Sequence, residues 1–183
     1  MCLRRPDLVD RAVLLSAPPP FPPERIELSA LARLGRLAYQ LPIAAPLPNA
    51  VKLRLLRRMG DTLGASDVPD IEPYIATLIQ PAQVRASTLL YRQFLLREVG
   101  PLIARRYGGK RLTVPVRYMV GSKDLLFYEG LVDEPASHAD DYRGEVLRDI
   151  GHFIPEEAPD LLRDRALEFL SAPVSQGTVA TPR

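Results

Sequence analysis

Short apolar runs bounded by turn residues constrain this chain more than any other feature of its sequence. One run, 12-AVLLSAP-18, is continuous and ends in prolines, and a second, 112-LTVPVRYMV-120, is closed by Gly121. A third and weaker run lies at 145-EVLRDI-150. Continuous apolar runs of this length are typical of strands that are buried on both faces of a parallel sheet. We therefore predict three such strands.

The residues between the first two predicted strands have helical periodicity and no strand signal. Apolar residues recur at three- and four-residue steps in 28-LSALARLGRLAYQL-41, 51-VKLRLLRRM-59, 72-EPYIATLI-79 and 81-PAQVRASTLLYRQFLLREV-99. A last amphipathic helix is predicted over 158–170. The order strand, helices, strand, loop, strand, helix indicates an α/β sheet with a helical insertion.

These elements predict one partial α/β core rather than two independent domains. A chain of 183 residues is long enough for one ordinary domain. We assign residues 1–18 and 109–171 to the core and residues 19–108 to the helical insertion. Residues 172–183 are small, polar and aperiodic, so we expect a disordered tail.

The composition excludes several classes of protein. A hydrophobic content of 46% with 25% charged residues is that of a soluble globular protein. The formal net charge of +2 is too small to imply a nucleic-acid partner. The sequence contains neither a membrane-spanning apolar run nor a signal peptide. Cys2 is the single cysteine, which excludes an internal disulfide framework. We therefore expect a cytoplasmic protein.

Two titratable residues directly follow predicted strands. Asp124 lies in 121-GSKDLLF-127, and His152 follows Gly151, which we expect to let the backbone turn sharply. Ligands gather at the carboxyl edge of open α/β sheets. A carboxylate there can accept the imidazole Nδ1–H, fix its tautomer and stabilise the imidazolium. We predict that the two residues form such a pair. The alternative is that Asp124 caps a turn while His152 is a packing residue.

The segments 113-TVPVRYMVGSKD-124 and 149-DIGHFIPEEAPDLLRDRALEFL-170 resemble the C-terminal part of an α/β-hydrolase, nearest the epoxide hydrolase and haloalkane dehalogenase branch. The segment 5-RPDLVDRAVLLSAP-18 is similar to the one that follows the nucleophile-bearing helix in those proteins. The resemblance implies that Asp124 is the orienting acid and His152 the general base. It also implies that the helical insertion is the family's cap and that no cofactor is needed.

The family's nucleophile lies on a glycine-flanked elbow between a strand and a helix, ahead of the acid and the histidine in the chain. Thr62 in 60-GDTLG-64 has the glycine spacing, but a basic amphipathic helix precedes it in place of a strand. Ser16 ends a predicted strand but lacks the pair of glycines. We therefore expect a truncated chain that holds the acid and the histidine, lacks the nucleophile and is inactive alone.

Two tyrosines of the insertion are candidates for binding a substrate oxygen. In the epoxide-opening branch, cap tyrosines donate hydrogen bonds to the ring oxygen as negative charge develops on it. Tyr91 in 88-TLLYRQF-94 resembles the family's tyrosine–arginine pair, and Tyr39 is a looser candidate for the second tyrosine. The alternative is that both are amphipathic packing residues.

The remaining charged residues of note do not predict a site. Lys52, Arg54, Arg57 and Arg58 alternate with apolar residues at helical spacing, so we predict a solvated helix face rather than a lipid or RNA surface. His138 lies in a polar loop, and we predict a surface residue. Two histidines far apart, without a cluster of further ligands, imply no metal site.

The resemblance implies hydrolysis of an epoxide, an ester or a carbon–halogen bond of a small molecule, through a covalent intermediate, in the complete enzyme. Two alternatives remain open. In the first, the chain is a non-catalytic interaction module that pairs the bare edge of its first strand with a partner or a second copy. In the second, a separate polypeptide supplies the nucleophile. A bare apolar strand edge also predicts marginal stability or aggregation of the isolated chain.

Overall fold

The computed structural model describes residues 1–17, 21, 40–62, 68, 72–125, 127–128 and 130–172 of the 183-residue chain. Most of the helix predicted over 28–41 and nearly all of the tail predicted over 172–183 lie outside the described residues. Within them, strands and helices follow one another in the order that the sequence predicts.

Three parallel strands form one sheet, and the most deeply buried strand is in the middle. Strands β1 (Ala12–Leu15), β2 (Val116–Gly121) and β3 (Tyr142–Leu147) lie in the order β1-β2-β3, and every residue of β2 is buried. β2 begins only after Pro115, which has no N–H to offer to the ladder. The predicted α/β fold with three parallel strands is confirmed.

The ends of β1 and β3 lie earlier in the chain than predicted, and backbone conformation explains both ends. The strand predicted over 145–150 is found at Tyr142–Leu147, and it ends shortly before Asp149, whose φ of 62° is left-handed. The first strand likewise ends at Leu15 because Ser16 has a φ of 47°. A non-glycine residue with positive φ cannot continue an extended strand.

The helices of the insertion pack against one another, and the last helices follow the sheet. α5 packs against α2, α3 and α4. α5 and α8 both begin with proline in the first turn, where its missing N–H has no partner to lose. The helices and 3-10 helices are η1 (Pro6–Leu8), α2 (Gln40–Ala44), α3 (Asn49–Thr62), α4 (Glu72–Leu78), α5 (Pro81–Arg97), α6 (Val99–Ile103), η4 (Glu134–His138), α7 (Ile154–Glu157) and α8 (Pro159–Ser171).

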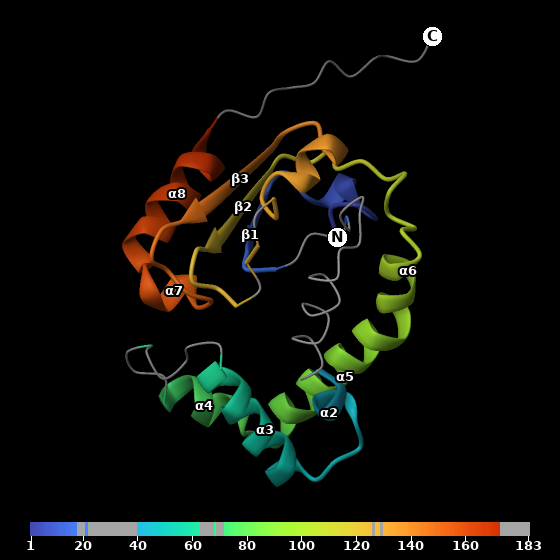
Figure 1. Ribbon diagram of the computed structural model, residues 1–183, viewed down its shortest axis with the longest axis vertical. Helices are drawn as coiled ribbons and strands as arrows, with labels where there is room; N and C mark the ends of the chain where they lie inside the picture. The colour runs from blue at the N-terminus through green and yellow to red at the C-terminus, as the bar shows by residue number, and fades with distance from the viewer. Residues whose placement is uncertain are drawn as a thin grey trace.

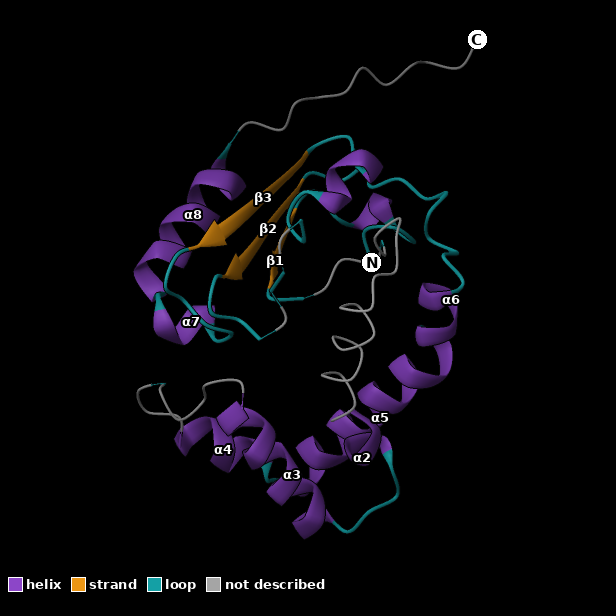
Figure 2. Ribbon diagram, viewed as in Figure 1, coloured by secondary structure: helices purple, strands orange, loops and turns teal. Residues whose placement is uncertain are grey.

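The insertion lies at one end of the sheet. Figure 1 shows α2–α6 as a group of helices apart from the sheet, whereas α7 and α8 lie beside it. The arrowheads of β2 and β3 in Figure 2 point toward the side of the molecule on which α3 and α4 lie. The carboxyl ends of the strands, where α/β proteins bind ligands, therefore face the helical insertion.

The two faces of β2 contact different parts of the chain. Tyr118 and Val120 pack with Leu131 on one face. Met119 packs with Ile154, at the start of α7, on the other face. Within the described ranges, no helix is both long and apolar enough to cross a membrane.

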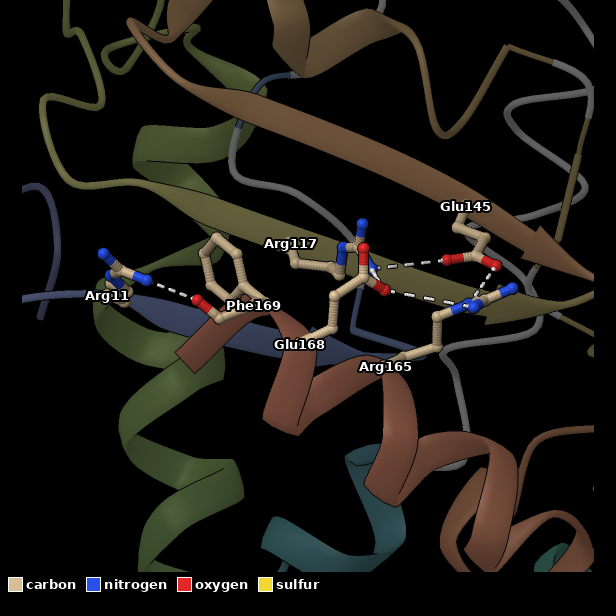
Figure 3. A network of polar contacts seen from close by, with 6 residues as sticks. All are labelled: Arg11, Arg117, Glu145, Arg165, Glu168 and Phe169. Carbon is tan, nitrogen blue, oxygen red and sulfur yellow. Dashed lines mark hydrogen bonds and ion pairs between the residues drawn. The ribbon is translucent and has the colours of Figure 1, made fainter. Parts of the chain in front are cut away.

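A cluster of charged side chains, which we call the Arg117 cluster, lies between the sheet and α8. Figure 3 shows Arg117 from β2 and Glu145 from β3 pointing toward Arg165 and Glu168 of α8. The Arg117 side chain is only 4% exposed, and its Nη1 lies 3.9 Å from Glu145 Oε2 and 3.8 Å from Glu168 Oε2. Arg165 Nε donates to Glu145 Oε1 at 3.0 Å. Arg117 is therefore surrounded by carboxylates that lie too far away for direct hydrogen bonds.

Candidate active site

A close approach of two loops brings the ends of β2 and β3 together. A Cβ added to Gly121, at the end of β2, would lie 2.1 Å from the carbonyl oxygen of Ile150 and 2.2 Å from that of Gly151. No side chain fits at these distances, so glycine is required at position 121. The backbone that leads to His152 can thus lie directly against the end of β2.

Hydrogen bonds then join the two loops. Ser122 N–H donates to Leu147 O, and Lys123 N–H donates to Ile150 O, both at 2.9 Å. The Ser122 hydroxyl in turn accepts the N–H of Asp149 at 2.9 Å. These bonds span both loops just before Asp124 and His152, so they fix the position of one loop relative to the other.

Asp124 and His152 lie in direct contact at this edge of the sheet. The distance from His152 Nδ1 to Asp124 Oδ2 is 2.9 Å, and the Asp124 side chain is 0% exposed whereas that of His152 is 23% exposed. A carboxylate accepts hydrogen bonds, so Nδ1 carries the proton and Nε2 of the neutral ring is left as the basic nitrogen. The predicted contact is present, with a buried acid and a reachable base.

The acid is shielded from water and lies near the buried Tyr118 phenol. Tyr118 of β2 is buried, and its hydroxyl has no hydrogen-bond partner among the described residues. Burial raises the pKa of the Tyr118 phenol well above its ordinary value, and the nearby Tyr142 phenol and Asp124 carboxylate raise it further. A carboxylate in such surroundings acts on the imidazole with little screening by water.

The main chain around His152 is held by two side chains. Ser16, at the end of β1, donates its hydroxyl to the carbonyl oxygen of His152 at 3.2 Å. Glu157 accepts the N–H of Gly151 at 2.6 Å and the N–H of Phe153 at 3.0 Å. The sequence pattern predicts neither role, since Ser16 is notable there only as a possible nucleophile and Glu157 is not singled out.

The reason for glycine at position 151 differs from the expected one. We expected Gly151 to make a sharp turn, but the left-handed residue of this loop is Asp149, and the φ of Gly151 is not positive. A Cβ at Gly151 would instead lie 2.8 Å from Oε1 of Glu157. The absence of a side chain makes room for the Glu157 carboxylate.

Neither alternative nucleophile occupies an elbow. Thr62 is the last residue of α3, which covers the segment expected to be a helix, so no strand leads to it. Ser16 does follow a strand, but it is buried and its hydroxyl donates to the main chain of His152 rather than to the imidazole.

The two candidate tyrosines have different outcomes. Tyr91 is half-buried on α5 and makes a polar or ring contact, and its role toward a substrate stays a prediction. Tyr39 lies outside the described residues.

Of the charged residues predicted to form a solvated helix face, Arg54, Arg57 and Arg58 are exposed, but the predictions for Lys52 and His138 were wrong. Lys52 is buried rather than solvated: α3 packs against α5, and Lys52 Nζ donates to Thr88 Oγ1 at 2.7 Å. The helical spacing alone did not reveal that a long aliphatic stem can line a packed face. His138 is half-buried rather than a free surface residue, because its ring stacks on Phe21 at a centroid distance of 4.5 Å. The described part of the chain contains no group of three or more metal-ligating side chains.

Comparisons with known proteins identify the fold. No protein-family model matches the chain, and no curated protein matches it. Among solved structures, a variant of a candidate epoxide hydrolase from Pseudomonas aeruginosa superposes with a TM-score of 0.69 and 22% identity, over 93% of this chain and 60% of that one. The epoxide hydrolase CorEH superposes with a TM-score of 0.64 and 21% identity, over 91% of this chain and 60% of that one. A candidate α/β-hydrolase from Nostoc sp. PCC 7120 superposes with a TM-score of 0.66 and 20% identity, over 94% of this chain and 61% of that one.

These likenesses show the fold and its extent. These three structures are described as epoxide hydrolases or an α/β-hydrolase, and the chain has their fold. It spans about 60% of the length of the solved structures that it matches. The three strands therefore correspond to part of an α/β-hydrolase sheet.

Proposed function

We propose that Asp124 and His152 are the acid and the general base of an α/β-hydrolase that opens an epoxide or cleaves an ester or carbon–halogen bond. The observation that supports this most directly is the 2.9 Å contact between His152 Nδ1 and a fully buried Asp124 carboxylate. The pair follows the carboxyl ends of β2 and β3, and these strand ends point toward the helical insertion (Figure 2). The solved structures with the same fold include epoxide hydrolases.

The geometry suits His152 to proton transfer in the second half of a two-step hydrolysis. In the first step the nucleophile attacks a substrate carbon to form a covalent intermediate, and the bond from that carbon to the epoxide oxygen, the ester alkoxy oxygen or the halogen breaks, with its electron pair going to the displaced atom. In the second, His152 Nε2 takes a proton from a water molecule as the water oxygen attacks that intermediate. The imidazolium formed is then stabilised by Asp124, which holds Nδ1 and remains ionised.

The nucleophile is to be sought outside the described residues, since neither Ser16 nor Thr62 occupies an elbow. We propose that it belongs to the part of the fold that this chain does not span. The helical insertion acts as a cap in this proposal, with Tyr91 as a candidate donor to a substrate oxygen. The chain alone is then expected to hydrolyse neither styrene oxide nor p-nitrophenyl esters above background.

A second candidate function is that of an interaction module. Among the described residues, β1 pairs with β2 on one side only, and its residues are half-buried. A strand from another polypeptide, or from a second copy, would satisfy its free N–H and C=O groups. The two candidates are compatible when the pairing polypeptide is the one that carries the nucleophile.

The decisive experiment adds the part of the fold that this chain does not span. A chimera would place the segment of the Pseudomonas aeruginosa protein that the superposition leaves uncovered ahead of this chain. We expect the folded chimera to turn over styrene oxide. With His152→Ala, an aspartate nucleophile would still be alkylated but not released, so mass spectrometry should detect the chimera plus one substrate mass. Turnover by a folded chimera that His152→Ala leaves unchanged would contradict the proposal.

A further inference from the structure

Glu157 contacts the main chain on both sides of His152. Its Oε2 accepts the N–H of Gly151 at 2.6 Å, and its Oε1 accepts the N–H of Phe153 at 3.0 Å. Hydrogen bonds to a carboxylate are shorter and stronger than those between neutral groups. A single side chain therefore spans the residue that carries the imidazole.

The local fold directs Glu157 back to this position. Phe153 precedes α7, and the N–H of Glu157 donates to the Phe153 carbonyl at 2.9 Å, which places Glu157 one helical turn further along. The side chain then returns along the same turn to the N–H groups that precede the helix. An added Cβ at Gly151 would lie 2.8 Å from Oε1 and 3.1 Å from Oε2. Gly151 and Glu157 are thus spatially matched.

The remaining polar group of this segment has its own partner. The carbonyl of His152 accepts the Ser16 hydroxyl at 3.2 Å, and Ser16 N–H donates to Met119 O at 3.0 Å. Ser16 is buried and holds a left-handed φ of 47°. The His152 peptide is therefore fixed to the sheet through Ser16 and to α7 through Glu157.

We propose that Glu157 is a positioning residue for His152, acting with Ser16 through the main chain rather than on the reacting atoms. This inference rests on the proposed role of His152 as the base. The His152 ring is 23% exposed and lies edge-on to Phe153 at a centroid distance of 5.3 Å, so its direction depends on the main chain that carries both residues. A fixed backbone keeps Nδ1 on Asp124 and so keeps Nε2 as the basic nitrogen.

The test uses nuclear magnetic resonance of the 183-residue chain, which has only two histidines to assign. In Glu157→Gln the amide group retains one acceptor and presents an N–H₂ to the other donor. We expect the exchange of the Gly151 or Phe153 amide proton to rise by about tenfold or more, as for loss of one charge-assisted hydrogen bond. We also expect the neutral His152 ring to shift measurably from the Nδ1–H toward the Nε2–H tautomer. The matched control is Glu156→Gln, on the same turn, which should move neither signal.

A double-mutant cycle separates positioning from general stability. Gly151→Ala alone should displace Glu157 and shift the tautomer as Glu157→Ala does, whereas Gly151→Ala added to Glu157→Ala should shift it little further. Two additive effects, or a folded Glu157→Ala variant that keeps the Nδ1–H tautomer, would overturn the inference. Because these signals need no substrate, they report on Glu157 even if the proposed hydrolase activity fails.

Discussion

In the Arg117 cluster, we predict that the effect of removing a charge on the stability of the fold depends on which charge is removed. Arg117 is 4% exposed, and its Nε and Nη1 have no hydrogen-bond partner among the described residues. At 3.8–3.9 Å, each carboxylate attracts the guanidinium by about 4 kcal/mol near a protein surface. Burying an ion costs several kcal/mol, so this attraction does little more than offset it.

We therefore expect Arg117→Met to change the free energy of unfolding by no more than about 1 kcal/mol, or to raise it. Glu145→Gln should lower it by about 3 kcal/mol, because it leaves Arg117 buried beside the more exposed Glu168 alone. The variant that combines Arg117→Met with Glu145→Gln should recover most of the free energy lost in Glu145→Gln, since no buried guanidinium remains.

Urea denaturation followed by circular dichroism measures all three variants, with Arg163→Met as the control for loss of an exposed arginine. The control should leave the midpoint unchanged. If Arg117→Met lowered the free energy of unfolding by more than about 3 kcal/mol while Glu145→Gln did not, attraction would outweigh desolvation in this cluster and the reasoning would be refuted.

Three further predictions concern the site and its support. Gly121→Ala should destabilise the fold by about 3 kcal/mol or more, since its Cβ would lie 2.1 Å from the carbonyl oxygen of Ile150. Gly100→Ala is the control, because an added Cβ there has nothing within 4 Å, and it should be neutral or stabilise α6. Thermal melts of the two variants compare these effects. The raised pKa of Tyr118 contributes stability that is complete below the ordinary tyrosine pKa of about 10 and is lost as the pH rises above that value. The urea midpoint of the unchanged chain should therefore fall between about pH 9 and about pH 11, and Tyr118→Phe should make this fall smaller. In an active chimera, Asp124→Asn should lower kcat by about 10⁴-fold with little change in KM, and an unchanged kcat would exclude Asp124 as the orienting acid.

The order of elements could be predicted because strand-length apolar runs and helical periodicity are local signals. The ends of β1 and β3 could not be predicted in this way, because they depend on the left-handed conformations of Ser16 and Asp149. Neither serine nor aspartate requires such a conformation. The contact of Asp124 with His152 was predictable because parallel strands bring their carboxyl ends to one edge. It needed no knowledge of the loops.

The support of the site was hidden from sequence reasoning. A glutamate in the first turns of a helix is ordinarily solvated, and nothing in 151-GHFIPEE-157 distinguishes Glu157 from its neighbour Glu156. The useful signal is the glycine before His152, which leaves room for another group to lie close to the main chain at that point. Lys52 was missed for a similar reason, because its burial depends on how α3 packs against α5.

The groups that hold the imidazole, Asp124, Ser16 and Glu157, all belong to this one chain. Under the proposed function, the groups that accept the proton are therefore assembled separately from the nucleophile that breaks the substrate bond. In a hydrolase of this design, exchanging a serine for an aspartate on another segment would change the bond that is cleaved while leaving the base untouched. Under that proposal the nucleophile can change independently of the part held by Asp124, Ser16 and Glu157.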